Sequence, residues 1–139
     1  MGIFSRLSDI VNSNINAMLD KAEDPEKMIR MVIQEMEETL VEVRSTTARI
    51  IADKKELTRR DKRLEKQAVE WENKAELAIN AGREDLAKAA LMEKTAVNEM
   101  ITLVHEDMAK LDSALNQLSL EIEQLQSKLN EARARQKAL

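Results

Sequence analysis

The sequence predicts an all-α fold, in which a short amphipathic helix precedes a long antiparallel two-helix coiled-coil hairpin. The composition supports this, because 35% of the 139 residues are charged and only 1% are aromatic, with two glycines and one proline. An apolar seven-residue repeat runs from Ile29 to Ala78, and a second one runs from Ala87 to Leu139. The only break between the two repeats is Asn80-Ala81-Gly82, which marks the expected turn of the hairpin.

Residues 1–22 are the expected amphipathic helix. Its apolar side chains recur at helical spacing and form one stripe. The opposite face is mostly serine and asparagine, so a lipid surface would be held by apolar insertion more than by attraction to anionic headgroups. Periodicity equally allows a stripe that packs on the hairpin or on another subunit. The residues that we interpret as membrane-binding are Ile3, Phe4, Leu7, Ile10, Val11, Ile15, Met18 and Leu19.

Residues 23–26 form the expected hinge. Asp24 can cap a helix, and Pro25 suits the first helical position. Because Pro25 also disfavours helical geometry at Asp24, the first helix should end before it. The segment 1–22 is therefore expected to move separately from the hairpin at 27–139.

One register pairs the two repeats along the whole hairpin. The layers Leu40 with Leu125 and Leu57 with Met108 both join residue numbers that add to 165, so the chain should fold back between Gly82 and Arg83. Gly82 can adopt the left-handed conformation that ends a helix at little steric cost. The predicted turn is accordingly Asn80, Ala81 and Gly82.

A few side chains interrupt the apolar seam, which is formed by the a and d positions of the two repeats. Lys54 and Asp61 occupy a positions, where polar residues more often set the register than bind a ligand. Trp71 occupies a d position opposite Lys94, which allows a cation–π contact between them. We read all of these as parts of the coiled coil.

Enzymatic function is not expected. The chain has no cysteine and one histidine, His105, and it lacks a nucleophile elbow or a glycine-rich phosphate loop. We therefore predict no catalytic residues, no metal site and no cofactor. The net charge of −4 weighs against direct nucleic-acid binding. The repeat still continues at Leu139, which suggests part of a longer protein.

Several segments resemble the bacterial phage shock protein A family, which includes the vesicle-inducing protein of plastids. They are the opening Met-Gly-Ile-Phe-Ser-Arg, the joint from Lys21 to Pro25, the run Ile33-Gln-Glu-Met-Glu37, and Gly82-Arg-Glu-Asp-Leu-Ala-Lys-Ala-Ala-Leu91 at the turn. These segments follow one another in the family's order along the whole chain.

The resemblance implies a cytoplasmic stress-response protein, peripheral on the inner face of the inner membrane and related to the ESCRT-III superfamily. It implies that the protein protects membrane integrity and self-associates into large oligomers. It also implies negative regulation, by direct contact, of the AAA+ transcription activator of the phage shock operon. A passive coiled-coil scaffold without membrane activity is the alternative that the residues leave open.

Overall fold

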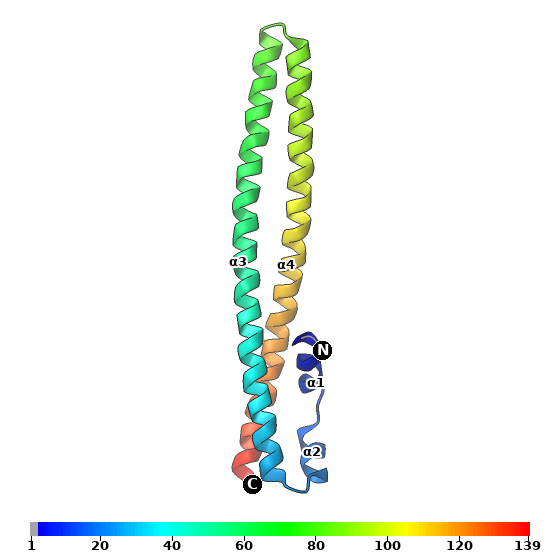
Figure 1. Cartoon of the computed structure of the whole chain (residues 1–139), viewed down its shortest axis with the longest axis vertical. Coiled ribbons are helices and arrows are strands. Elements are labelled where there is room, and N and C mark those ends of the chain that lie inside the picture. Colours follow the sequence, from blue (N-terminus) through cyan, green and yellow to red (C-terminus); the bar gives the residue numbers. More distant parts are fainter. Residues whose placement is uncertain (1–2) are drawn as a thin grey trace. The chain divides into compact units, whose positions relative to one another are not determined.

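The computed structural model describes the backbone of residues 3–139 and the side chains of residues 6–139. Four helices follow one another, namely α1 (Ile3–Val11), α2 (Ile15–Lys21), α3 (Pro25–Asn80) and α4 (Glu84–Ala138), and the described residues contain no strand. The long helices α3 and α4 pack against each other as a hairpin (Figure 1). The predicted all-α fold with a two-helix hairpin is confirmed.

The chain divides into two compact units. Unit 1 contains α1, α2, α3 as far as Ile50, and α4 from Ala114 onwards. Unit 2 is the intervening stretch Ile51–Ser113, which includes the turn of the hairpin. Each unit has its own apolar cluster.

The core of unit 1 draws side chains from all four helices. Its α3 and α4 members follow the predicted a and d positions, as the heptad repeat requires. Its α1 and α2 members come from the N-terminal stripe. The buried residues of this cluster are Leu7, Ile15, Leu19, Ile29, Ile33, Met36, Leu40, Val43, Leu118, Leu125, Leu129 and Ala132.

The core of unit 2 is thinner and contains only residues of the hairpin. Leu64, Ala68, Val97 and Val104 are buried, with Leu57, Trp71, Ile101 and Met108 packed against them. Closer to the turn the buried seam residues are the alanines Ala75, Ala87 and Ala90. Their small side chains leave little apolar area to bury at this end of the hairpin.

Polar pairs across the seam of unit 2 report the register. Lys54 pairs with Asp112, Asp61 with His105, and Glu72 with Lys94, so that each pair of residue numbers adds to 166. A slip by one heptad would change that sum by seven. These sums differ by only one from the value of 165 predicted for the apolar layers, so the polar pairs fit the predicted register.

The turn is a Schellman motif around Gly82. Helix α3 ends at Asn80, and Gly82 has a φ of +71°. The amide of Arg83 donates to the carbonyl oxygen of Ala78 at 2.8 Å, and the amide of Gly82 donates to Ile79 at 3.0 Å. Asp85 then lies in the first turn of α4, where hydrogen bonds from Arg83 and from the backbone amide of Leu86 lower its pKa.

The N-terminal segment contains two helices where the sequence predicted one. Helix α1 ends at Val11, and Asn14 is the N-cap of α2, where its side chain accepts a hydrogen bond from the amide of Ala17 at 3.0 Å. The hydroxyl of Ser13 donates to the carbonyl oxygen of Ile10 at 2.6 Å. These short polar side chains bond to the nearby backbone, which favours a cap over a continuous helix.

Candidate membrane-binding surface

From Leu7 onwards, the part of the apolar stripe whose side chains are described packs against the hairpin in unit 1. Leu7, Ile15 and Leu19 are 0%, 2% and 6% exposed. Ile10 and Val11 are half-buried against the same cluster, and Met18 is half-buried. Ile3 and Phe4 belong to α1, but their side chains lie outside the described residues. The packing on the hairpin that periodicity left open is therefore the arrangement in this structure.

Methionines line a groove beside the stripe. Ile10 and Met18 contribute from α1 and α2, while α3 contributes Met28, Met31 and Met36. Methionine is flexible and polarizable, so it fills irregular gaps without demanding one fixed packing. The methionine side chains can therefore adjust to small changes in how the N-terminal segment packs along α3.

Polar contacts fasten the edges of the N-terminal segment. The guanidinium of Arg6 donates to the carboxylate of Glu42 and lies 3.8 Å from that of Glu35, both on α3. The ammonium of Lys128 on α4 donates to the carbonyl oxygen of Ser13 at 2.8 Å. Pairs as exposed as those of Arg6 contribute at most about 1 kcal/mol each. The segment is therefore held mainly by its buried apolar side chains.

The hinge residues lie at the start of α3. Pro25 is its first residue, and the carboxylate of Asp24 accepts a hydrogen bond from the amide of Lys27 at 3.2 Å. Ala22 is extended, with φ −78° and ψ 138°, so α2 and α3 are separate helices.

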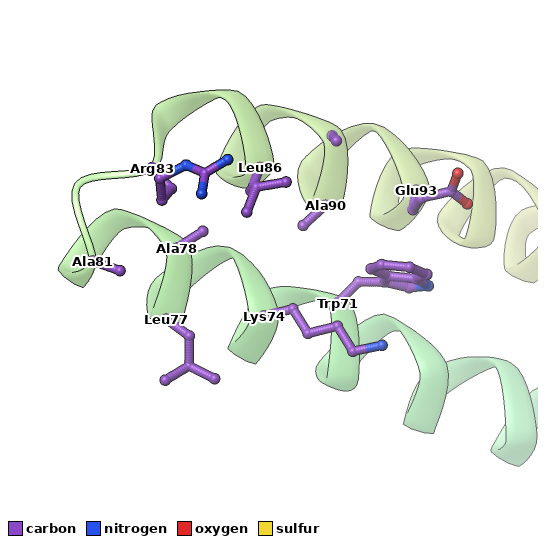
Figure 2. Close-up of a pocket in the computed structure, with 10 residues that line it drawn as sticks. Trp71, Lys74, Leu77, Ala78, Ala81, Arg83, Leu86, Ala90 and Glu93 are labelled. Atoms are coloured by element: carbon purple, nitrogen blue, oxygen red, sulfur yellow. The ribbon is translucent and has the colours of Figure 1, made fainter.

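A shallow pocket lies beside the turn in unit 2 (Figure 2). Trp71 extends from α3 toward α4 there, with Ala90 and Glu93 on the facing helix. The sequence allowed a cation–π contact between Trp71 and Lys94, but the ring has another partner. Lys74 lies over the indole ring instead, 4.3 Å from its centroid. Lys94 pairs with Glu72, since a carboxylate offers a charged partner that the ring cannot match.

One group of side chains in the described part of the chain could hold a cation. Nε2 of His105 lies 2.8 Å from the carboxylate of Asp61, and one oxygen of Glu65 lies within 4.8 Å of both. Asp61 is the polar a-position residue noted in the sequence. His105 accordingly provides a polar partner for a carboxylate in the seam.

None of the helices that the structure describes has the length and apolar character that crossing a bilayer requires. The candidate surface is instead a short amphipathic segment, separated by residues 22–24 from a helical hairpin whose first helix is capped by Asp24. Such a segment can lie in the interface plane of a bilayer. The fold and this surface together define a helical-hairpin protein with an amphipathic N-terminal module.

The particular family follows from comparison with known proteins. Residues 2–139 match the model of the PspA/IM30 family, and the chain belongs to that family. The resemblance to phage shock protein A noted in the sequence is thereby confirmed.

Named relatives support this membership. The chain is 33% identical to the membrane-associated protein Vipp1 of Synechocystis sp. over 139 residues, which are 100% of this chain and 52% of the relative. It is 32% identical to the phage shock protein A homolog of Deinococcus radiodurans, covering 100% of this chain and 62% of that protein. A phage shock protein A homolog of Bacillus subtilis is 34% identical over 102 residues, 73% of this chain and 45% of the relative. The chain thus spans about half the length of the curated relatives it matches.

Proposed function

We propose that this chain is a peripheral membrane protein of the stress response, which binds and protects a lipid surface through residues 1–22. The observation that carries the proposal is the apolar stripe on a short amphipathic segment that is separate from α3 and held at its edges by a few polar contacts. Membership of a family whose relatives include a "membrane-associated protein" supports it. The proposed location is the cytoplasmic face of the inner membrane.

In this proposal the stripe exchanges one apolar environment for another. Leu7, Ile15 and Leu19 are already out of water against the hairpin, so their transfer to lipid gains little apolar burial. The half-buried Val11 and Met18 gain more. Lipid and hairpin then compete for the same side chains, and a ligand shifts such an equilibrium by its differential affinity for the two states.

Vesicle flotation tests the proposal. The full chain should float with vesicles of phosphatidylethanolamine and phosphatidylglycerol, and Val11→Glu and Met18→Glu should each weaken flotation about tenfold or more because each places a charge in the stripe. Asn12→Glu, on the polar face, is the matched control and should float almost like the unmodified chain. Equal flotation of all these variants would refute insertion of the stripe.

Burial of the stripe favours a second candidate, a passive scaffold whose N-terminal helices only complete the core of unit 1. That candidate predicts no flotation of the unmodified chain. It also predicts that Val11→Glu acts only on the stability of unit 1, as measured by thermal unfolding. The flotation series therefore separates the two functions.

We also propose that the hairpin self-associates and restrains the AAA+ transcription activator of the phage shock operon by direct contact. The support is family membership together with the resemblance noted in the sequence. Exposed apolar residues on the hairpin, among them Val41, Val69 and Leu103, provide surface for protein contacts. Titration of the chain into an ATPase assay of the activator tests this, and an unchanged rate at saturating chain would refute it.

A further inference from the structure

The N-terminal helices cover one defined side of the hairpin. In an antiparallel pair, the positions just before a in both helices lie on the same side. Between Val32 and Thr46 on α3, and between Ala114 and Lys128 on α4, these positions in unit 1 are buried or half-buried, whereas Arg135 near the end of α4 is exposed. The buried or half-buried residues are Val32, Thr39, Thr46, Ala114, Glu121 and Lys128. In unit 2 the matching positions, Asp53, Arg60, Gln67, Glu93, Met100 and Asp107, are exposed.

The edge contacts identify what covers this side. Arg6 of α1 pairs with both Glu35 and Glu42, which lie one turn before and one turn after Thr39 on α3. The ammonium of Lys128 donates to the carbonyl oxygen of Ser13, which lies at the break between α1 and α2. Helix α1 and the break that follows it therefore lie over the side that contains Thr39 and Glu121.

Two polar atoms under this cover have no hydrogen-bond partner among the described residues. Thr39 is 0% exposed, and its hydroxyl is unpaired. In contrast, the hydroxyls of Thr47 and Thr58 each donate to the carbonyl oxygen four residues earlier, at 2.9 Å. The second atom is Oε2 of Glu121, which is inaccessible and unpaired although Gln117 donates to Oε1 at 2.8 Å.

Unpaired buried polar groups are costly, and a carboxylate oxygen is more costly than a hydroxyl. Because the N-terminal helices cover the side that contains both atoms, we assign this cost to the docked state. We propose that Thr39 and Glu121 destabilise the docked state and so set the threshold at which the stripe passes from the hairpin to lipid. This inference rests on the proposed membrane function and concerns its regulation.

Substitutions that remove the polar atoms without touching the stripe test the proposal. Thr39→Val and Glu121→Met keep side chains of similar size, and each should stabilise the docked state. A smaller undocked fraction lowers the apparent affinity in proportion. We expect vesicle binding to weaken about three- to tenfold for each variant.

Matched controls come from unit 2. Thr58→Val removes a hydroxyl that is already paired, and Glu93→Met alters the same heptad position four heptads away on α4, where it is exposed. Neither control should change vesicle binding. Hydrogen exchange without vesicles provides an independent readout, and the amides of residues 3–21 should exchange more slowly in Thr39→Val and Glu121→Met than in the controls.

The outcomes separate this inference from the function on which it rests. Weaker vesicle binding with slower exchange of residues 3–21 supports it. Unchanged or tighter binding by both variants, while the unmodified chain floats normally, overturns the threshold role and leaves membrane binding intact. Failure of the unmodified chain to bind vesicles of phosphatidylethanolamine and phosphatidylglycerol overturns both.

Discussion

The ammonium of Lys128 lies 2.8 Å from the carbonyl oxygen of Ser13, so the last helix of the hairpin holds the break between the two N-terminal helices. Arg6 forms the corresponding contact with α3, through Glu42 and Glu35. Both contacts lie at the edge of the docked segment and outside its apolar stripe. They can therefore be weakened without altering the side chains that are proposed to meet lipid.

Removing these contacts should favour lipid binding. Lys128→Ala and Arg6→Ala each take a stabilising contact from the docked state, and we expect vesicle binding to tighten about two- to fivefold. Flotation across a range of lipid concentrations measures this. Arg133→Ala, which removes a pair with Glu37 within the hairpin of unit 1, is the control. Weaker binding by Arg6→Ala would indicate instead that this arginine contacts the headgroups.

Two leucines of equal burial should differ in their effect on stability. Leu7 and Leu125 are both 0% exposed in the core of unit 1. Leu125→Ala should lower the free energy of unfolding by about 2 to 4 kcal/mol, because it opens a cavity in the hairpin seam. Leu7→Ala should cost less than Leu125→Ala, since a helix that opens locally can lose at most its docking free energy. Urea unfolding followed by circular dichroism measures both, and equal losses would show that α1 unfolds only with the hairpin.

The register can be tested with paired cysteines, because the chain has none of its own. Leu40→Cys with Leu125→Cys should form an intramolecular disulfide on mild oxidation. Leu40→Cys with Leu118→Cys should not, since the second position lies one heptad, about 10 Å, further along the helix. Non-reducing electrophoresis distinguishes the two chains. A disulfide in the second pair alone would indicate that the true register differs from the predicted one by a heptad.

The polar interruption of the seam in unit 2 should limit stability. Asp61 is only 16% exposed, and the partner identified for its carboxylate is His105. Asp61→Leu should therefore raise the free energy of unfolding by about 1 kcal/mol, because it restores an apolar a position. His105→Ala, which leaves the carboxylate in place, should give no such gain. A loss of stability in Asp61→Leu would mean that the polar pair stabilises this layer.

The hairpin could be predicted because its causes are local and periodic. The heptad spacing gives the seam, and Gly82 is the residue whose positive φ the Schellman turn requires. The pairs Lys54 with Asp112 and Glu72 with Lys94 follow the same register. A heptad repeat therefore determines how its two helices pair, since the position of each apolar layer constrains the next.

The docking of the N-terminal helices could not be predicted in the same way. An amphipathic stripe shows which side chains avoid water. One side of the hairpin and a lipid surface would both remove the side chain of Leu7 from water, so the stripe does not distinguish between them. On the hairpin, the positions that the N-terminal helices cover include the apolar Val32 and Ala114, whereas the matching exposed positions include Asp53 and Asp107. Glu121 and Lys128 are also covered, so this difference is too weak to predict docking. The cation–π partner of Trp71 could not be chosen from the sequence either, because the heptad spacing places Lys94 opposite Trp71 but does not show that Lys94 pairs with Glu72 and that Lys74 lies over the ring.

Locking the N-terminal segment onto the hairpin tests most directly whether the stripe must leave it to bind lipid. Ser13→Cys with Lys128→Cys, joined by a short bismaleimide, should hold the segment docked, whereas Glu72→Cys with Lys94→Cys constrains the hairpin alone. We expect the first cross-link to abolish vesicle flotation and the second to leave it unchanged. Undiminished flotation of the chain cross-linked between positions 13 and 128 would contradict release of the stripe as the step that permits membrane binding.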